Sequence, residues 1–98
     1  MNIVQKRNGN ALTIAPEGYL DTTTAPQLES ELKTALVGVE ALTFDFEKLE
    51  YISSAGLRVL LAAQKTMNRQ GAMKVIHVNE VIMEIFEVTG FADVLTIE

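Results

Sequence analysis

Apolar residues recur along the chain at spacings that change between two and about 3.6 residues, which predicts alternating strands and helices. Residues 2–7 and 11–16 carry short strand patterns on either side of an Asn-Gly-Asn turn at 8–10. These two segments predict a β-hairpin. Pro16 has no N–H to donate, so we expect the second strand to end or bulge there.

Three segments show apolar residues at three- and four-residue intervals and begin with residues that favour helix starts. The first has Thr24 as its cap and Pro26 in its first turn, the second has Ser54 as its cap, and the third has Asn79. Each ends near a glycine, in order Gly38, Gly71 and Gly90. We interpret their apolar stripes as core positions.

The remaining apolar blocks predict strands at 41–46, 73–78 and 94–97. The resulting order is strand, strand, helix, strand, helix, strand, helix, strand, with connections of a few residues. This alternation is typical of an α/β fold with right-handed crossovers between parallel strands. We therefore predict one small α/β domain over residues 1–98, with a mostly parallel sheet and an antiparallel hairpin at its amino-terminal end.

Composition restricts the chemistry that such a domain can perform. Of the 98 residues, 48% are hydrophobic, which is enough to build a core. The absence of cysteine excludes a disulfide, a thiolate zinc site and a cysteine nucleophile. The single histidine, His77, excludes a multi-histidine site, and we expect no metal. We also expect His77 to be structural, because no Gly-x-Ser-x-Gly elbow accompanies it.

Charge and hydropathy narrow the possible partners. The net charge is −5 and the eight basic residues are scattered, which argues against nucleic-acid binding. No apolar run approaches about 18 residues and the amino terminus lacks the apolar block of a signal peptide, so we expect no membrane insertion and a cytoplasmic location. The glycines never cluster as a nucleotide-binding loop, so we expect no cofactor.

The start of the second helix is the strongest candidate for a functional site. With Ser54 as the cap, Ala55, Gly56 and Leu57 form the first turn, and their N–H groups have no partner within the helix. A serine here serves as an ordinary cap, yet the same N–H groups and the helix dipole also favour a phosphoryl group. The spacing alone leaves both interpretations open.

Asp21, in the loop before the first helix, is a second candidate. Turn preferences favour an ordinary turn or capping role for this residue. If the strands run parallel, however, its loop and the loop of Ser54 leave the sheet on the same side. Asp21 could then bind the Ser54 hydroxyl or repel a phosphate on it.

Three stretches resemble signature segments of the STAS domain family, whose best-known members are bacterial anti-sigma factor antagonists. They are the loop Gly18–Ala25, the strand, loop and helix start Phe44–Leu57, and the segment Val88–Val94. Each stretch is weakly specific by itself, but all three occur in the family's order and spacing. Many relatives add a terminal helix, so a chain ending at Glu98 resembles either a minimal version or one whose sheet is partly open for a partner.

The resemblance implies a partner-switching phosphoprotein rather than an enzyme. In such proteins an anti-sigma factor serine kinase phosphorylates a serine at the start of the second helix, and a PP2C-type phosphatase removes the phosphate. Alignment on Gly56-Leu57 places this serine at Ser54. Ser53 is an alternative acceptor, since many members have Asp there. The implied partner-binding face comprises Asp21, Thr22, Ser53, Ser54, Gly56, Leu57 and Arg58.

Two other hypotheses about the function remain open. A STAS-type subunit of a transporter or sensory assembly would bind its partner constitutively, and its complex would be indifferent to Ser54→Asp. An enzyme with Ser54 as its nucleophile would turn over an acyl or phosphoryl substrate and lose that activity in Ser54→Ala.

Overall fold

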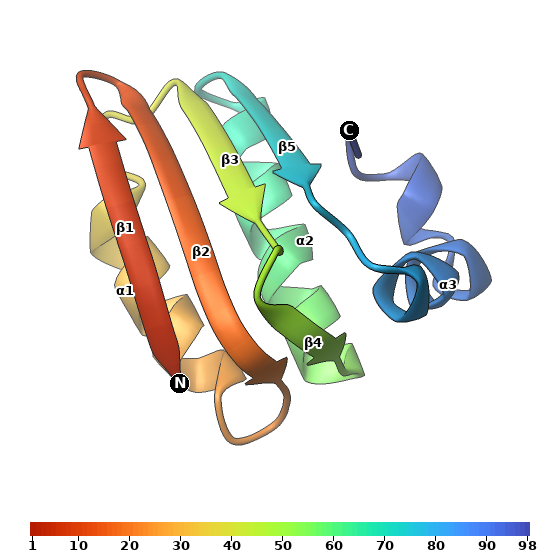
Figure 1. Ribbon diagram of the computed structural model, residues 1–98. Helices are drawn as coiled ribbons and strands as arrows, with labels where there is room; N and C mark the ends of the chain where they lie inside the picture. Colours follow the sequence, from red (N-terminus) through yellow and green to blue (C-terminus); the bar gives the residue numbers. More distant parts are fainter.

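A five-stranded β-sheet forms the frame of the protein, and the computed structural model describes residues 1–98. Two of the helices cover one face of this sheet and the third lies beside it (Figure 1). The elements in chain order are β1 (Asn2–Asn8), β2 (Ala11–Leu20), α1 (Ala25–Ala35), β3 (Ala41–Asp45), β4 (Leu49–Ile52), α2 (Ser54–Asn68), β5 (Ala72–Ile76), α3 (Glu80–Thr89) and the 3-10 helix η1 (Phe91–Asp93).

The strand pairing confirms the predicted fold class. β1 and β2 form the antiparallel hairpin, while β2 pairs with β3, and β3 with β5, in parallel. β4 pairs in parallel with the end of β2 beyond the point where β3 stops. Helices α1 and α2 both lie behind the sheet in Figure 1, and α3 contacts β4.

The prediction that the second strand ends or bulges at Pro16 is wrong, because β2 continues to Leu20. Pro16 lies opposite Ile3, and β2 pairs with β3 only as far as Ile14 and with β4 only from Gly18 onward. In an antiparallel hairpin, hydrogen-bonded and non-hydrogen-bonded residue pairs alternate along the two strands, starting with a hydrogen-bonded pair beside a two-residue turn. Counted from Asn8 and Ala11, the pair of Ile3 and Pro16 is a non-hydrogen-bonded one. The Pro16 nitrogen therefore faces the gap between β3 and β4, where no ladder bond is lost. The register of the β2–β4 pairing shifts instead between Gly18 and Tyr19, where Glu50 of β4 is the extra residue.

The short strand β4 was not predicted. The expected strand 41–46 ends at Asp45, whose carboxylate Oδ1 accepts a hydrogen bond from the Glu47 N–H at 3.0 Å. The Leu49 N–H then bonds to the Phe46 carbonyl at 3.1 Å, and the chain resumes an extended course as β4. A turn thus separates β3 from a further strand that begins at Leu49.

The predicted closing strand at 94–97 is also wrong. Only one bridge joins this segment to the sheet, between Val75 and Ile97. Gly90 adopts a left-handed φ of 83° and the chain then turns through η1, which inserts Leu95 into the core. The preceding strand β5 likewise stops at Ile76 rather than at the predicted position 78.

The core lies mainly between the sheet and the two covering helices, and α3 adds the fully buried Ile82 and Phe86. Alternate residues of β2 and β3 are buried, including Leu12, Ile14, Leu42 and Phe44, so the other set faces the uncovered side of the sheet. Of the predicted helix caps, Asn79 is confirmed by its side-chain oxygen, which accepts from the Ile82 N–H at 2.8 Å. None of the helices combines the length and apolarity that a membrane crossing requires.

Candidate functional site

The first turn of α2 presents a free hydroxyl. Ser53, not Ser54, is the N-cap, so the predicted cap is displaced by one residue and Ser54 is the first residue of the helix. The first intrahelical bond runs from the Leu57 N–H to the Ser53 carbonyl at 2.9 Å. The N–H groups of Ser54, Ala55 and Gly56 therefore lack helical partners. Ser54 itself is exposed, so its hydroxyl is accessible at the positive end of the helix.

Ser53 occupies a different environment from its neighbour. Its Oγ is buried and has no hydrogen-bond partner, and its side chain does not cap the helix. The Ser53 N–H donates instead to the Leu20 carbonyl at 2.9 Å, which holds the residue in an extended conformation. The two adjacent hydroxyls thus differ sharply in accessibility.

The Asp21 loop is a closed network of hydrogen bonds. Asp21 Oδ1 accepts from the Thr23 N–H at 3.0 Å, from the Thr23 hydroxyl at 2.7 Å and from the Thr24 N–H at 3.2 Å. These bonds, above all that from the Thr23 hydroxyl, lower the pKa of Asp21. Asp21 therefore has the role of an ordinary turn residue in the loop before α1. Thr24 is the N-cap of α1, but its hydroxyl accepts from the Asp21 N–H and donates to the Tyr19 carbonyl instead of capping the helix.

The structure brings the Asp21 and Ser54 loops to the same end of the sheet, as the parallel order predicted. Leu20 is in register with Ile52 at the ends of β2 and β4, and the bond from the Ser53 N–H to the Leu20 carbonyl joins the two loops. Asp21 and Ser53 are therefore the first residues beyond two adjacent strand ends. Figure 1 shows α2 beginning directly after β4 at this end.

Gly56 explains why the start of α2 packs so closely on the strands. A Cβ at this position would lie 2.7 Å from Ile52 Cγ1 and 2.8 Å from Leu20 Cγ. Gly56 and Leu57 are both buried, so they shape the surface from below, whereas the predicted docking residues Thr22 and Arg58 are exposed.

An exposed aromatic pair beside this site was not predicted. Tyr19 of β2 and Tyr51 of β4 are in register, and their ring centroids lie 6.4 Å apart. They are 56% and 41% exposed, a high fraction for aromatic side chains. Their neighbours Leu20 and Ile52 are fully buried, so period-two alternation places both rings on the uncovered face. Alternation in the sequence could not have identified Tyr51, because the register of the β2–β4 pairing shifts and the buried residues of β4 are Leu49 and Ile52.

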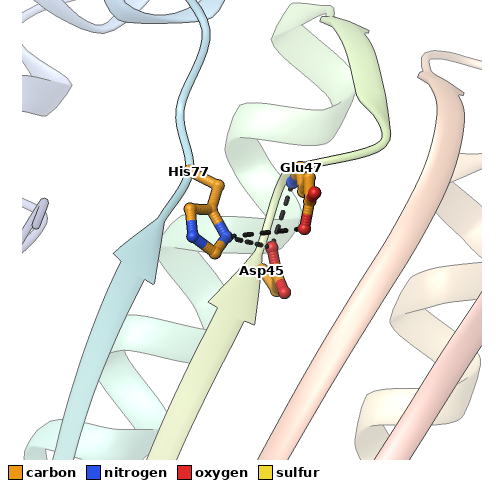
Figure 2. A group of neighbouring side chains, drawn as sticks. All are labelled: Asp45, Glu47 and His77. Atoms are coloured by element: carbon orange, nitrogen blue, oxygen red, sulfur yellow. Dashed lines mark hydrogen bonds and ion pairs between the residues drawn. The ribbon is translucent and has the colours of Figure 1, made fainter.

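His77 contacts carboxylates and no serine. Its Nδ1 lies 2.8 Å from Asp45 Oδ1 and 4.0 Å from Glu47 Oε2, at the ends of β5 and β3 (Figure 2). The hydrogen bond to Asp45 raises the pKa of His77. The only imidazole of the chain is therefore engaged away from the Ser54 hydroxyl. What the Ser54 site offers chemically is an accessible hydroxyl and unpaired N–H donors that favour an added anion.

Comparisons with known proteins find relatives over almost the whole chain. A family model described as the STAS domain matches residues 2–98. BtrV of Bordetella bronchiseptica, provisionally named an anti-sigma factor antagonist, is 30% identical over 99 residues, which cover 99% of this chain and 85% of BtrV. The anti-sigma-B factor antagonist of Bacillus subtilis is 26% identical over 98 residues, which cover 99% of this chain and 90% of the relative.

Solved structures show the same fold. The anti-sigma factor antagonist SpoIIAA in its unphosphorylated form aligns with a TM-score of 0.85 at 17% identity, covering 99% of this chain and 88% of SpoIIAA. The phosphorylated form of SpoIIAA from Bacillus aligns with a TM-score of 0.77 at 17% identity, covering 99% and 91% of the two chains.

Proposed function

Because this chain belongs to the STAS domain family, we propose that it is an anti-sigma factor antagonist. In this role it regulates transcription by partner switching in the cytoplasm, under the control of reversible phosphorylation at Ser54. Unphosphorylated, it binds the anti-sigma factor, which releases the sigma factor. An anti-sigma factor serine kinase adds the phosphate and a PP2C-type phosphatase removes it.

The exposed hydroxyl of Ser54 at the first residue of α2 is the observation that carries this proposal. A kinase must reach the hydroxyl that it modifies, and the buried Oγ of Ser53 is far less accessible. The unpaired N–H groups behind Ser54 also favour the product, since a phosphoserine carries about −1.5 to −2 charge at neutral pH. Relatives named as anti-sigma factor antagonists, and a SpoIIAA structure solved in a phosphorylated form, support a role as a phosphorylated anti-sigma factor antagonist.

The switch follows from the chemistry of the docking face. We assign this face to Asp21, Thr22, Ser54 and Arg58, shaped from below by Ser53, Gly56 and Leu57, with the Tyr19–Tyr51 pair at its edge. Aromatic side chains are frequent binding anchors at interfaces. A dianion in the middle of this face has to lose its water when a partner docks, which is costly unless a cation meets it. Phosphorylation therefore releases the partner without a large change in fold.

Phosphate mapping tests the proposal. The protein is incubated with ATP and the candidate kinase encoded by a neighbouring gene, and the modified residue is located by mass spectrometry. We expect phosphate on Ser54, its loss in Ser54→Ala, and normal phosphorylation of the matched control Ser53→Ala. Phosphate on Ser53, or none on either serine, contradicts the assignment.

Partner binding separates the proposal from a constitutive binding subunit. Ser54→Asp adds a charge to the docking face, so it should weaken the anti-sigma factor complex more than Ser54→Ala does. If Ser54→Asp and Ser54→Ala bind the partner with equal affinity, the result would favour the hypothesis of a subunit that binds its partner constitutively.

A further inference from the structure

Three potential metal ligands converge at the carboxyl ends of two neighbouring parallel strands, away from the Ser54 site. Asp45 is the last residue of β3, Glu47 lies in the turn after it, and His77 follows β5 (Figure 2). One ligand atom from each residue lies within 4.8 Å of the other two. Asp45 and His77 are 32 residues apart in the chain, and the β3–β5 pairing brings them together.

The distances suit a small divalent ion. Zn²⁺ with bonds of about 2.0–2.1 Å in a tetrahedral arrangement holds its ligand atoms about 3.3–3.4 Å apart. The two measured separations from His77 Nδ1, 2.8 Å to Asp45 Oδ1 and 4.0 Å to Glu47 Oε2, fall on either side of this value. The Glu47 side chain is 70% exposed, so its rotation can change the longer of these two separations.

Neighbouring groups orient the Asp45 carboxylate and leave the Glu47 carboxylate without a lysine or arginine partner. The Glu47 N–H donates to Asp45 Oδ1 at 3.0 Å, which orients that carboxylate in the manner of an outer-shell partner. Lys48, which follows Glu47 in the chain, pairs with Glu17 at 3.9 Å. No Lys or Arg side chain forms an ion pair with Asp45 or Glu47.

We propose that Asp45, Glu47 and His77 bind one divalent transition-metal ion of the Zn²⁺ class, with water completing its coordination. The imidazole nitrogen determines which class of metal ion is expected, because imidazole suits Zn²⁺ and other transition-metal ions, whereas purely oxygen ligands would suit Mg²⁺ or Ca²⁺. The ion replaces the hydrogen bond between His77 and Asp45 and ties the end of β5 to the turn between β3 and β4. The sequence did not predict this site, since it offers one histidine and no cysteine.

Titration of the metal-free full chain with ZnCl₂, followed by calorimetry and by ¹⁵N chemical shifts of the imidazole, tests the proposal. His77→Asn is the decisive variant, because His77 has a φ of 58° and Asn tolerates this left-handed conformation. Asp45→Asn is the second variant. Glu87→Gln, an exposed carboxylate on α3, is the matched control.

We expect one equivalent of Zn²⁺ to bind with a shift of the His77 nitrogen resonances. Binding should weaken at least tenfold in His77→Asn and Asp45→Asn, and should be unchanged in Glu87→Gln. MgCl₂ should cause no imidazole shift. Absence of saturable Zn²⁺ binding, or binding that survives His77→Asn with full affinity, overturns the proposal.

Discussion

Replacing Ser54 by Asp should stabilise the protein and weaken its partner complex at the same time. The substitution places a carboxylate on the first residue of α2, where the helix dipole and three N–H groups without helical partners favour negative charge. Because Ser54 is exposed, the new charge keeps its water and no burial cost opposes the gain. A variant that binds poorly because it is damaged would instead lose stability.

The size of the gain follows from the position of the charge. A carboxylate in the first turn is worth about 0.3–1 kcal/mol at low ionic strength. Arg58 stands four residues later on the exposed side of the helix and adds about 0.2–0.5 kcal/mol. Asp21 on the adjoining strand end opposes both contributions. We therefore expect the free energy of unfolding to rise by about 0.3–1 kcal/mol, which raises Tm by about 1–8 °C for a domain of this size.

Urea and thermal unfolding of Ser54→Asp and Ser54→Asn measure this effect. The two variants are nearly isosteric and differ in charge, so their difference isolates the electrostatic contribution. The difference should shrink when salt is raised from about 0.01 M to 1 M, because the Debye length falls from about 30 Å to 3 Å. If Ser54→Asp is no more stable than Ser54→Asn at low salt, the electrostatic account of the helix start is wrong.

Three further predictions test the frame around the site. Gly56→Ala should lower the free energy of unfolding by about 1–2 kcal/mol, because the added Cβ would lie 2.8 Å from Leu20 Cγ. This overpacking exceeds the stability that alanine gains through its higher helix propensity. Urea denaturation measures the loss, and an unchanged midpoint would refute the close packing. Asn79→Ala should cost about 1 kcal/mol through loss of the α3 cap, whereas Asn79→Asp should retain most of the stability, and equal losses would argue against capping. Asp21→Asn should flatten the loss of stability in acid. Hydrogen bonds from Thr23 keep the pKa of Asp21 in the folded protein below 3.8. The contribution of Asp21 to the free energy of unfolding is therefore present above that pH and is lost as pH falls through the lower folded-state pKa. If the slope of the unfolding free energy against pH is the same in Asp21→Asn as in the parent protein, this prediction is wrong.

Local patterns were sufficient for the three helices, the amino-terminal hairpin and the strands β3 and β5, but not for β4 or for the segment after α3. The Asn79 cap and the left-handed Gly90 lie where helix-start and helix-stop preferences place them. The predicted N-cap of α2 was one residue too late in the chain, because Ser53 and Ser54 are both serines and cap helices equally well. Tertiary structure decides between them, since the Ser53 N–H is committed to the Leu20 carbonyl.

Features that depend on non-local pairing were beyond the reach of the sequence. β4 has four residues and exists through its pairing with β2, so its own pattern is too short to recognise. Pro16 is tolerated because its nitrogen faces the gap between β3 and β4. The Tyr19–Tyr51 pair and the Asp45–His77 contact likewise join residues 32 positions apart. Such contacts become visible only when the strand register is known.

The affinity of the anti-sigma factor for the Ser54-phosphorylated and the unphosphorylated protein tests the central claim most directly. Both forms are titrated into the same anti-sigma factor by calorimetry, with Ser53→Ala as a control that retains the Ser54 hydroxyl. We predict that phosphorylation raises Kd at least tenfold, equivalent to about 1.4 kcal/mol or more, while circular dichroism shows the fold unchanged. Equal affinity of the two forms would contradict a switch at Ser54.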